Sequence, residues 1–280
     1  MRKFFLIVLP LLATTTALAQ SGTAFFPTDL VVEPFYANFL EPKIGFQFTR
    51  GDNNIRLDIG ASRDFVHFRP GTETTIGFGA DFFTYTRLRG ENNFRFPVEA
   101  VDYLFGINAT WLQGTSESGY GLRARYSHIS AHFVDGHSDS TLSTPVQAYW
   151  INDVRPHIYS REFFEFTPFI QSPSSREYIG ITYLLHVIPE NKSKVIFNGG
   201  VEYFLRLFKG SVNPFAAYDF RSITFDKMSI NNTLMAGIKF GEPYGAGLRI
   251  QYVYYSGYSI HGEFYNARET TSSFGFTIDF

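Results

Sequence analysis

The chain has 280 residues, a net charge of −2 and no cysteine. These values exclude disulfides, thiol catalysis, thiolate metal sites and the basic surface of a nucleic-acid-binding protein. Aromatic residues make up 18% of the chain although its mean hydropathy is only −0.08, which predicts apolar side chains spread over many strands instead of gathered in helical blocks.

The first twenty residues have the organisation of a secretory signal peptide. Arg2 and Lys3 are basic, the apolar run "FFLIVLPLL" follows, and "ALA" at 17–19 supplies the small residues of a cleavage site. The apolar run is shorter than the about 18 residues of a membrane-spanning helix, and no later segment reaches that length. We therefore predict an exported protein with a cleaved signal peptide at 1–20 and no transmembrane helix.

A short N-terminal segment, residues 21–42, contains three prolines and leads into one long domain, residues 43–280. Within the domain, apolar and polar residues alternate over segment after segment, which indicates β-strands. Clear examples are "KIGFQFTR" (43–50), "NIRLDIGAS" (54–62), "DYLFGINATW" (102–111), "KVIFNGGVEYFLR" (194–206) and "GLRIQYVYY" (247–255). Turn-forming clusters separate about twelve such segments, each near the about 10 residues of a tilted membrane-crossing strand.

The two faces of these strands differ in composition. One face is rich in Phe, Tyr, Ile and Leu, and the other mixes charged residues with glycine. A soluble β-sandwich also alternates, but a barrel in lipid is apolar outside and polar inside, and this pattern favours the barrel. The charges predicted to face the lumen are of mixed sign, which does not predict ion selectivity. They are Arg56, Asp58, Asp81, Arg123, Arg125, Glu202, Arg206 and Arg249.

One predicted strand carries a group of polar residues. The stretch "RYSHISAHFVDG", residues 125–136, places His128, Ser130 and His132 at alternate positions, with Asp135 after them. Alternation puts the first three opposite the inward-facing arginines of the same strand, so the register predicts that they look outward near the outer rim. A β-bulge in the middle of the strand would exchange the two faces.

The next predicted strand, "YSREFFEF" (159–166), brings Glu162 to the same face as His128 and Ser130. A carboxylate there would orient the histidine, which would activate the serine: nucleophile, base and orienting group. Such a His-x-Ser pair on the outer wall of a barrel resembles the outer-membrane phospholipase A and lipid A deacylase families. The resemblance implies an interfacial serine hydrolase that acts on membrane lipids.

The last segment, "TSSFGFTIDF" (271–280), has Phe274, Phe276, Ile278 and Phe280 at alternate positions. It resembles the C-terminal assembly signal of bacterial outer-membrane barrels, which implies recognition by the barrel assembly machinery. Signal peptide, alternation and this last strand together predict an all-β fold. We expect a single antiparallel transmembrane β-barrel of about 12 strands, after a cleaved signal peptide, in the outer membrane of a Gram-negative-type bacterium and surrounded by its lipids.

The spacing of the segments also predicts the topology. An even number of strands leaves both termini in the periplasm, with long extracellular connections at 88–96, 136–158 and 259–269. Short connections such as 113–118 and 171–175 then lie on the periplasmic side.

A second resemblance covers more of the chain. "LEPKIGFQF", "FPVEAVDYLFG", "RYSHISAHFVDG" and "YSREFFEF" occur in the order seen in an uncharacterised bacterial family, the domain of unknown function 1207, from about residue 26 to the C-terminus. The resemblance implies a membrane-embedded barrel and supplies no activity. The positions that match its central patterns are His128, Ser130, His132, Asp135, Ser160, Arg161 and Glu162. In this interpretation His132, Asp135, Ser160 and Arg161 form a structural polar cluster that fixes the long 136–158 connection.

No metal or cofactor is predicted, because His128 and His132 on one strand face are about 13 Å apart by the rise per residue. Two functions remain open: a structural or small-solute barrel, and a serine lipid hydrolase using Ser130, His128 and Glu162. An extracellular binding module built on the 136–158 connection is a third. No nucleotide motif occurs, and the sequence gives no indication of the oligomeric state.

Overall fold

The computed structural model describes the chain except residues 1–21, 52, 133–150, 153, 191–192 and 225–226. The predicted signal peptide, Asp135 and most of the 136–158 connection therefore lie outside the described residues. No helix in the described part of the chain is both long and apolar enough to cross a membrane.

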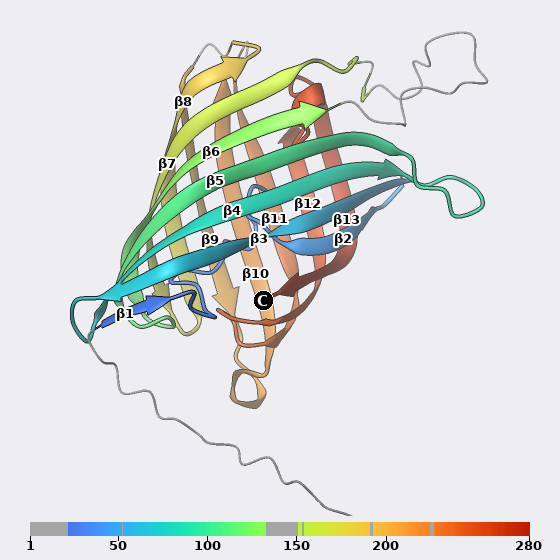
Figure 1. The fold of residues 1–280 in the computed structure, drawn as a ribbon. Coiled ribbons are helices and arrows are strands. Elements are labelled where there is room, and N and C mark those ends of the chain that lie inside the picture. The colour runs from blue at the N-terminus through green and yellow to red at the C-terminus, as the bar shows by residue number, and fades with distance from the viewer. Residues whose placement is uncertain (1–21, 52, 133–150, 153, 191–192, 225–226) are drawn as a thin grey trace, which may run out of the picture.

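The fold is a closed antiparallel β-barrel, which confirms the predicted all-β class and the predicted strand number (Figure 1). Twelve strands follow one another around the barrel, and β13 closes it by pairing with β2. A short additional strand, β1 (Gly22–Phe25), pairs with the last residues of β3. The barrel strands are β2 (Ile44–Thr49), β3 (Asn54–Arg69), β4 (Thr74–Arg89), β5 (Val98–Gly114), β6 (Gly119–His132), β7 (Tyr159–Ser172), β8 (Ser175–Ile188), β9 (Val195–Phe204), β10 (Val212–Thr224), β11 (Met228–Gly241), β12 (Gly247–Tyr258) and β13 (Arg268–Asp279).

The connections differ between the two ends of the barrel. We call the end that holds β1 the lower end and the opposite end the upper end, as they lie in Figure 1. The lower end has the turns at 70–73, 115–118, 173–174 and 242–246, and the connection at 205–211, which includes the 3-10 helix η3 (Phe208–Gly210). The upper end has the longer connections at 90–97, 133–158 and 259–267, the last of which includes the 3-10 helix η4 (Gly262–Phe264).

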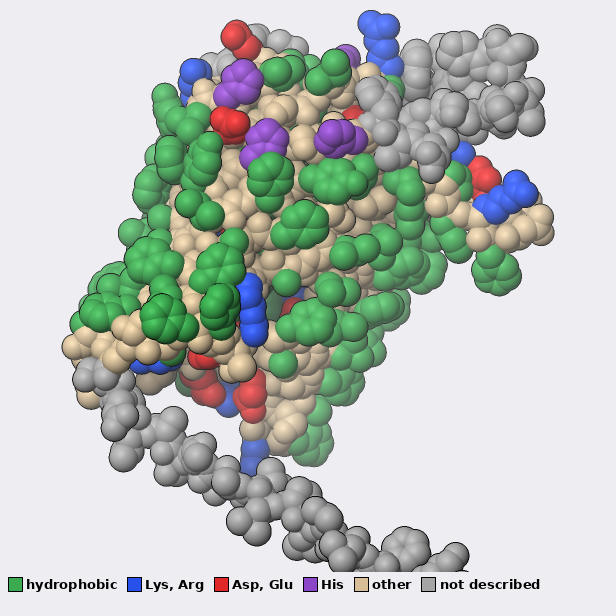
Figure 2. All heavy atoms as spheres, in the orientation of Figure 1, with side chains coloured by type: hydrophobic (Ala, Val, Ile, Leu, Met, Phe, Trp, Pro, Cys, Tyr) green, Lys and Arg blue, Asp and Glu red, His purple; other side chains and the backbone are tan. Residues whose placement is uncertain are grey.

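Alternation along the strands sets an apolar outer wall against a polar interior. On β5, for example, the outward-facing Phe105 and Ile107 are 50% and 62% exposed, whereas the inward-facing Asp102 of the same strand is 0% exposed. Figure 2 shows apolar side chains spread over the face of the wall that is turned to the viewer. This distribution is the reverse of that in a water-soluble protein, in which large apolar side chains gather inside.

The N-terminal segment runs inside the barrel before β2 begins. We call residues 30–43 the inner segment; ten of them, Val31, Val32, Phe35 to Glu41 and Lys43, are 0–7% exposed. Its aromatic rings pack on rings of the barrel strands, as where Phe35 stacks on Tyr178 with centroids 4.0 Å apart. Burying these rings removes a large apolar area from water, so the core of this barrel lies between the inner segment and the strands.

Candidate functional site

The polar residues predicted on β6 lie on the outer wall, near the upper end. His128, Ser130 and His132 occupy alternate positions and are not buried, whereas Ser127 and Ile129, on either side of His128 in the sequence, face the lumen and are 0% exposed. Figure 2 shows histidine and acidic side chains grouped above the apolar side chains of the wall. No bulge exchanges the faces of β6 against β5 or β7.

Strand β7 adds Ser160 and Glu162 to the same face, because Ser130 pairs with Ser160 and His128 with Glu162 in the sheet register. The Nδ1 atom of His128 lies 3.5 Å from Oε1 of Glu162, and the two side chains are 26% and 39% exposed. The structure thus brings His128 and the predicted orienting carboxylate together.

Strand β8 adds His186, which the sequence pattern did not indicate. Glu162 pairs with His186 and the adjacent Phe163 pairs with Leu184, so Leu185 is an extra residue in β8. This β-bulge places two consecutive residues, Leu185 and His186, on exposed positions. We call His128, Ser130, His132, Ser160, Glu162 and His186 the rim cluster.

The hydroxyl of Ser130 has a different partner from the predicted one. Its Oγ atom lies 3.2 Å from Nε2 of His132, while His128 faces Glu162. The rim cluster therefore contains a serine–histidine pair beside a histidine–glutamate pair, and rings of β5 flank both: Tyr103 lies 5.4 Å from the His132 ring and Phe105 lies 5.0 Å from the His128 ring. A hydrogen-bonded serine and histidine can serve as the nucleophile and the general base in the cleavage of an ester.

Arg161 is not part of the rim cluster. It lies between Ser160 and Glu162 in sequence, so the pleat turns its side chain into the lumen, where it is 7% exposed. Its guanidinium lies 5.2 Å from the ring centroid of Phe163. Of the predicted structural cluster, the structure thus places His132 and Ser160 outside and Arg161 inside. In the described part of the chain no three histidine or acidic side chains could hold a metal ion.

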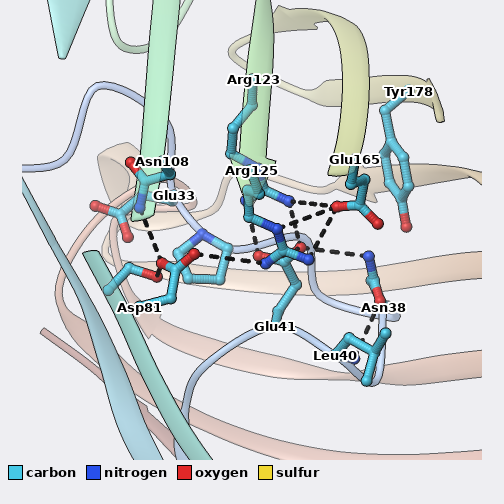
Figure 3. A network of polar contacts seen from close by, with 12 residues as sticks. Glu33, Asn38, Leu40, Glu41, Asp81, Asn108, Arg123, Arg125, Glu165 and Tyr178 are labelled. Carbon is cyan, nitrogen blue, oxygen red and sulfur yellow. Dashed lines mark hydrogen bonds and ion pairs between the residues drawn. The ribbon is translucent and has the colours of Figure 1, made fainter. Parts of the chain in front are cut away.

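A second polar arrangement fills the middle of the lumen. Glu41 of the inner segment accepts a hydrogen bond from Arg123, with Oε2 2.8 Å from the guanidinium, and Arg125 lies 2.9 Å from Glu165 (Figure 3). Their side chains are at most 6% exposed. Burial opposes the ionisation of Glu41, but the two arginines outweigh it and hold the pKa of this carboxyl below its ordinary value.

Towards the lower end, Arg176 fixes the first half of the inner segment. Its side chain is 0% exposed, lies 2.8 Å from Glu202, and donates hydrogen bonds of 2.8 and 2.9 Å to the carbonyls of Glu33 and Pro34. The same guanidinium lies 4.6 Å from the ring centroid of Phe35. Glu202 in turn accepts a hydrogen bond from a backbone N–H of the inner segment.

Most of the charges predicted in the lumen lie there. Those buried among the strands are Asp58, Asp81, Arg123, Arg125, Glu202 and Arg249, with Arg56 partly buried beside them. Arg206 is the exception, because β9 ends at Phe204 and the side chain lies at the lower end, 2.9 Å from Glu117.

The C-terminal residues lie on the strand that closes the barrel. Phe274, Phe276 and Ile278 project outward from β13 and are 59%, 43% and 37% exposed, and Phe280 follows the strand. The ring of Phe276 stacks on that of Phe46 in β2, with centroids 6.2 Å apart. Their place as an assembly signal stays a prediction.

Comparison with known proteins identifies one family. A family described as a protein of unknown function (DUF1207) matches residues 101–280, which run from β5 to β13 and include the rim cluster. No curated protein and no solved structure matches the chain.

Proposed function

The chain belongs to the DUF1207 family, whose description carries no activity, and from its geometry we propose that it is an integral β-barrel of the bacterial outer membrane with a closed lumen. It would be a structural membrane protein that acts through its wall and its ends and does not conduct solutes. Outer-membrane lipids would surround it, and the outward aromatic residues of β13 would meet the barrel assembly machinery during insertion.

The outer wall supports the membrane location. Large apolar side chains stay exposed on the outward face of the strands, and every strand from β2 to β13 is hydrogen-bonded to a neighbouring strand on each side. Lipid favours both features. Backbone polar groups find no water there and must pair with each other, and apolar side chains are stable in contact with the hydrocarbon. Fractionation tests this location: recovery in the outer-membrane fraction is expected, and recovery with the soluble proteins would contradict it.

The observation that carries the closed lumen is the burial of ten residues of the inner segment at 0–7% exposure. They are held by side chains of β6, β8 and β9, including Arg123, Arg176 and Glu202. Above Phe39 lies a cavity of about 70 Å³. The upper end is also covered, because Asp102 accepts hydrogen bonds from His261 and from the N–H of Gly262 in the β12–β13 connection.

Electrical recording in planar bilayers tests the closure. The intact barrel is expected to give no current above background, because charged side chains and the inner segment fill its cross-section. A variant that lacks residues 26–42 is expected to give discrete current steps. Steady single-channel currents from the intact protein would overturn the closed lumen and favour a small-solute channel.

A second function, hydrolysis of membrane lipids, is favoured by one observation: the 3.2 Å contact between Ser130 Oγ and His132 Nε2 on the lipid-facing wall. In this reaction the serine oxygen attacks an ester carbonyl, His132 takes the hydroxyl proton, and the proton then passes to the leaving alcohol. Water releases the acyl group in a second step.

Release of fatty acid from phospholipid or lipid A in mixed micelles tests this reaction. Ser130→Ala is expected to abolish it and Ser160→Ala, a matched serine on the next strand, to retain it. Comparing His132→Asn with His128→Asn identifies the base. Hydrolysis that survives Ser130→Ala, or its absence from the intact protein, would discard this second function.

A further inference from the structure

A groove of about 700 Å³ lies at the upper end, between the β2–β3 turn (50–53) and the β4–β5 connection (90–97). Its volume falls in the range of small-molecule binding sites. In Figure 1 the β4–β5 connection projects beyond the outline of the barrel. Six of its residues, Gly90 to Asn93, Arg95 and Phe96, line the groove. The rim cluster shares none of its lining residues, whereas Thr49, Asn54 and Ile55 also line the cavity above Phe39 in the lumen.

Backbone hydrogen bonds hold the two sides of the groove in place. The N–H of Gly90 donates to the carbonyl of Asn53 over 2.6 Å and joins the connection to the turn. The connection also closes on itself, because the N–H of Glu91 donates to the carbonyl of Arg95 over 2.9 Å. Asn93 and Phe94 have φ angles of 64° and 55°, the left-handed conformation that such a tight return requires. The backbone therefore fixes the shape of the groove.

The lining combines planar amides with aromatic rings. Asn53, Asn92 and Asn93 line it together with Phe48 and Phe96, whose side chains are 57% and 46% exposed. A carboxamide both donates and accepts hydrogen bonds in one plane, so it can bind two neighbouring hydroxyl groups of one ring. The C–H face of a sugar ring is apolar and packs on an aromatic face. This combination suits a polyhydroxylated ring.

The charges of the lining exclude other ligand classes. Among the lining residues that the structure describes, Glu91 and Arg95 are the two charged groups, and their charges cancel. A phosphate or other anion would require several cationic donors, and an acyl chain would require an apolar lining. The lining thus favours a neutral saccharide.

The position of the groove indicates the source of the saccharide. The Phe48 ring contacts Phe46, whose ring stacks on Phe276, so the groove is continuous with the apolar outer wall. Phe94, at the tip of the connection, is 93% exposed. We infer that the groove binds the saccharide headgroup of a glycolipid in the outer leaflet, beside the barrel. The choice of a glycolipid over a dissolved sugar rests on the proposed membrane location.

Binding to the full chain in detergent micelles, measured by calorimetry or thermophoresis, tests this inference. The probes are a glycolipid with an uncharged oligosaccharide headgroup, the same oligosaccharide without its acyl chains, and phosphatidylglycerol vesicles. The double variant Asn92→Ala, Phe96→Ala is expected to bind the uncharged glycolipid at least about tenfold more weakly, because it removes one amide and one stacking ring. Asn266→Ala, an exposed asparagine at the upper end outside the groove, is the matched control and keeps wild-type affinity.

Each probe distinguishes one outcome. Tight binding of the uncharged glycolipid with weaker binding of the free oligosaccharide supports the headgroup of a glycolipid. Equal affinity for both overturns the membrane source, and binding of the vesicles alone, or binding that the double variant does not change, overturns the saccharide site. Unchanged electrophoretic heat-modifiability of the variant shows that it is folded. Because binding in micelles does not depend on cellular location, failure here is separate from failure of the fractionation experiment.

Discussion

Strand β6 carries ionisable side chains on both of its faces, and the two sets have different surroundings. On the outer face, His128 meets Glu162 over 3.5 Å, and both side chains are at least one quarter exposed. On the inner face, Arg123 and Arg125 meet Glu41 and Glu165 with side chains at most 6% exposed. The comparison shows that one strand can hold the inner segment with one face and leave groups open to ligands on the other.

The difference in burial predicts a difference in stability. Exposed ion pairs contribute about 0–1 kcal/mol, because solvent screens them and ordering two side chains costs entropy. Removing one partner of a buried pair costs several times more, because the remaining charge stays buried without compensation. Substitutions on the two faces therefore separate structural groups from groups free to act on a ligand.

The largest expected effect is that of Arg176→Ala. This substitution leaves Glu202 buried without its cation and removes the hydrogen bonds to the carbonyls of Glu33 and Pro34. We expect a loss of about 3–5 kcal/mol in the free energy of unfolding, measured by urea denaturation in micelles. Arg206→Ala, at the exposed lower end, is the matched control and should cost less than about 1 kcal/mol. Similar losses in both variants would contradict the role of Arg176.

A smaller effect is expected of Glu41→Gln, because glutamine can still accept a hydrogen bond from Arg123. The loss of the charge should lower the free energy of unfolding by about 2 kcal/mol. Glu117→Gln, whose carboxylate pairs with Arg206 at the surface, should change it little.

The same variant predicts a pH dependence. The pKa of Glu41 is lower in the folded protein than its ordinary value of 4.5, so ionised Glu41 stabilises the fold above pH 4.5. This contribution is lost as the pH falls through the folded pKa. The melting temperatures of wild type and Glu41→Gln should therefore differ at pH 7 and converge in acid below pH 4.5. A constant difference across this range would show that the charge of Glu41 is not what matters.

The smallest effect on stability is expected of His128→Ala. Its side chain is 26% exposed and its partner Glu162 is 39% exposed, so the free energy of unfolding should stay within about 0.5 kcal/mol of wild type. A loss above about 2 kcal/mol would place the rim cluster among the structural groups and remove the contrast between the two faces of β6.

The sequence predicted the strands and their faces because period-two alternation encodes both directly. Arg123 and Arg125 could be placed inside and His128 and Ser130 outside on that basis alone. The partner of Ser130 could not be placed, because His128 and His132 are both two residues away and only the side-chain conformation selects one.

Other parts of the site depend on long-range contacts or local irregularities. The inner segment has no alternation that indicates its destination, and its partners are far along the chain: Glu41 and Arg123 are 82 residues apart, and Tyr36 and Glu202 are 166. His186 lies in the rim cluster because of the bulge at Leu185, and no residue type in that strand predicts this bulge. Sequence periodicity thus predicts the strands of the barrel wall better than the path and the partners of the inner segment.

Labelling of a single cysteine tests the closed lumen most directly, because the chain has no cysteine of its own. Ala37 of the inner segment is 1% exposed, and Asn266 at the upper end is exposed. In the folded protein, Ala37→Cys should resist a water-soluble maleimide until urea is added, whereas Asn266→Cys should react at once. Equal rates of labelling at the two positions in the folded barrel would contradict a lumen closed by the inner segment.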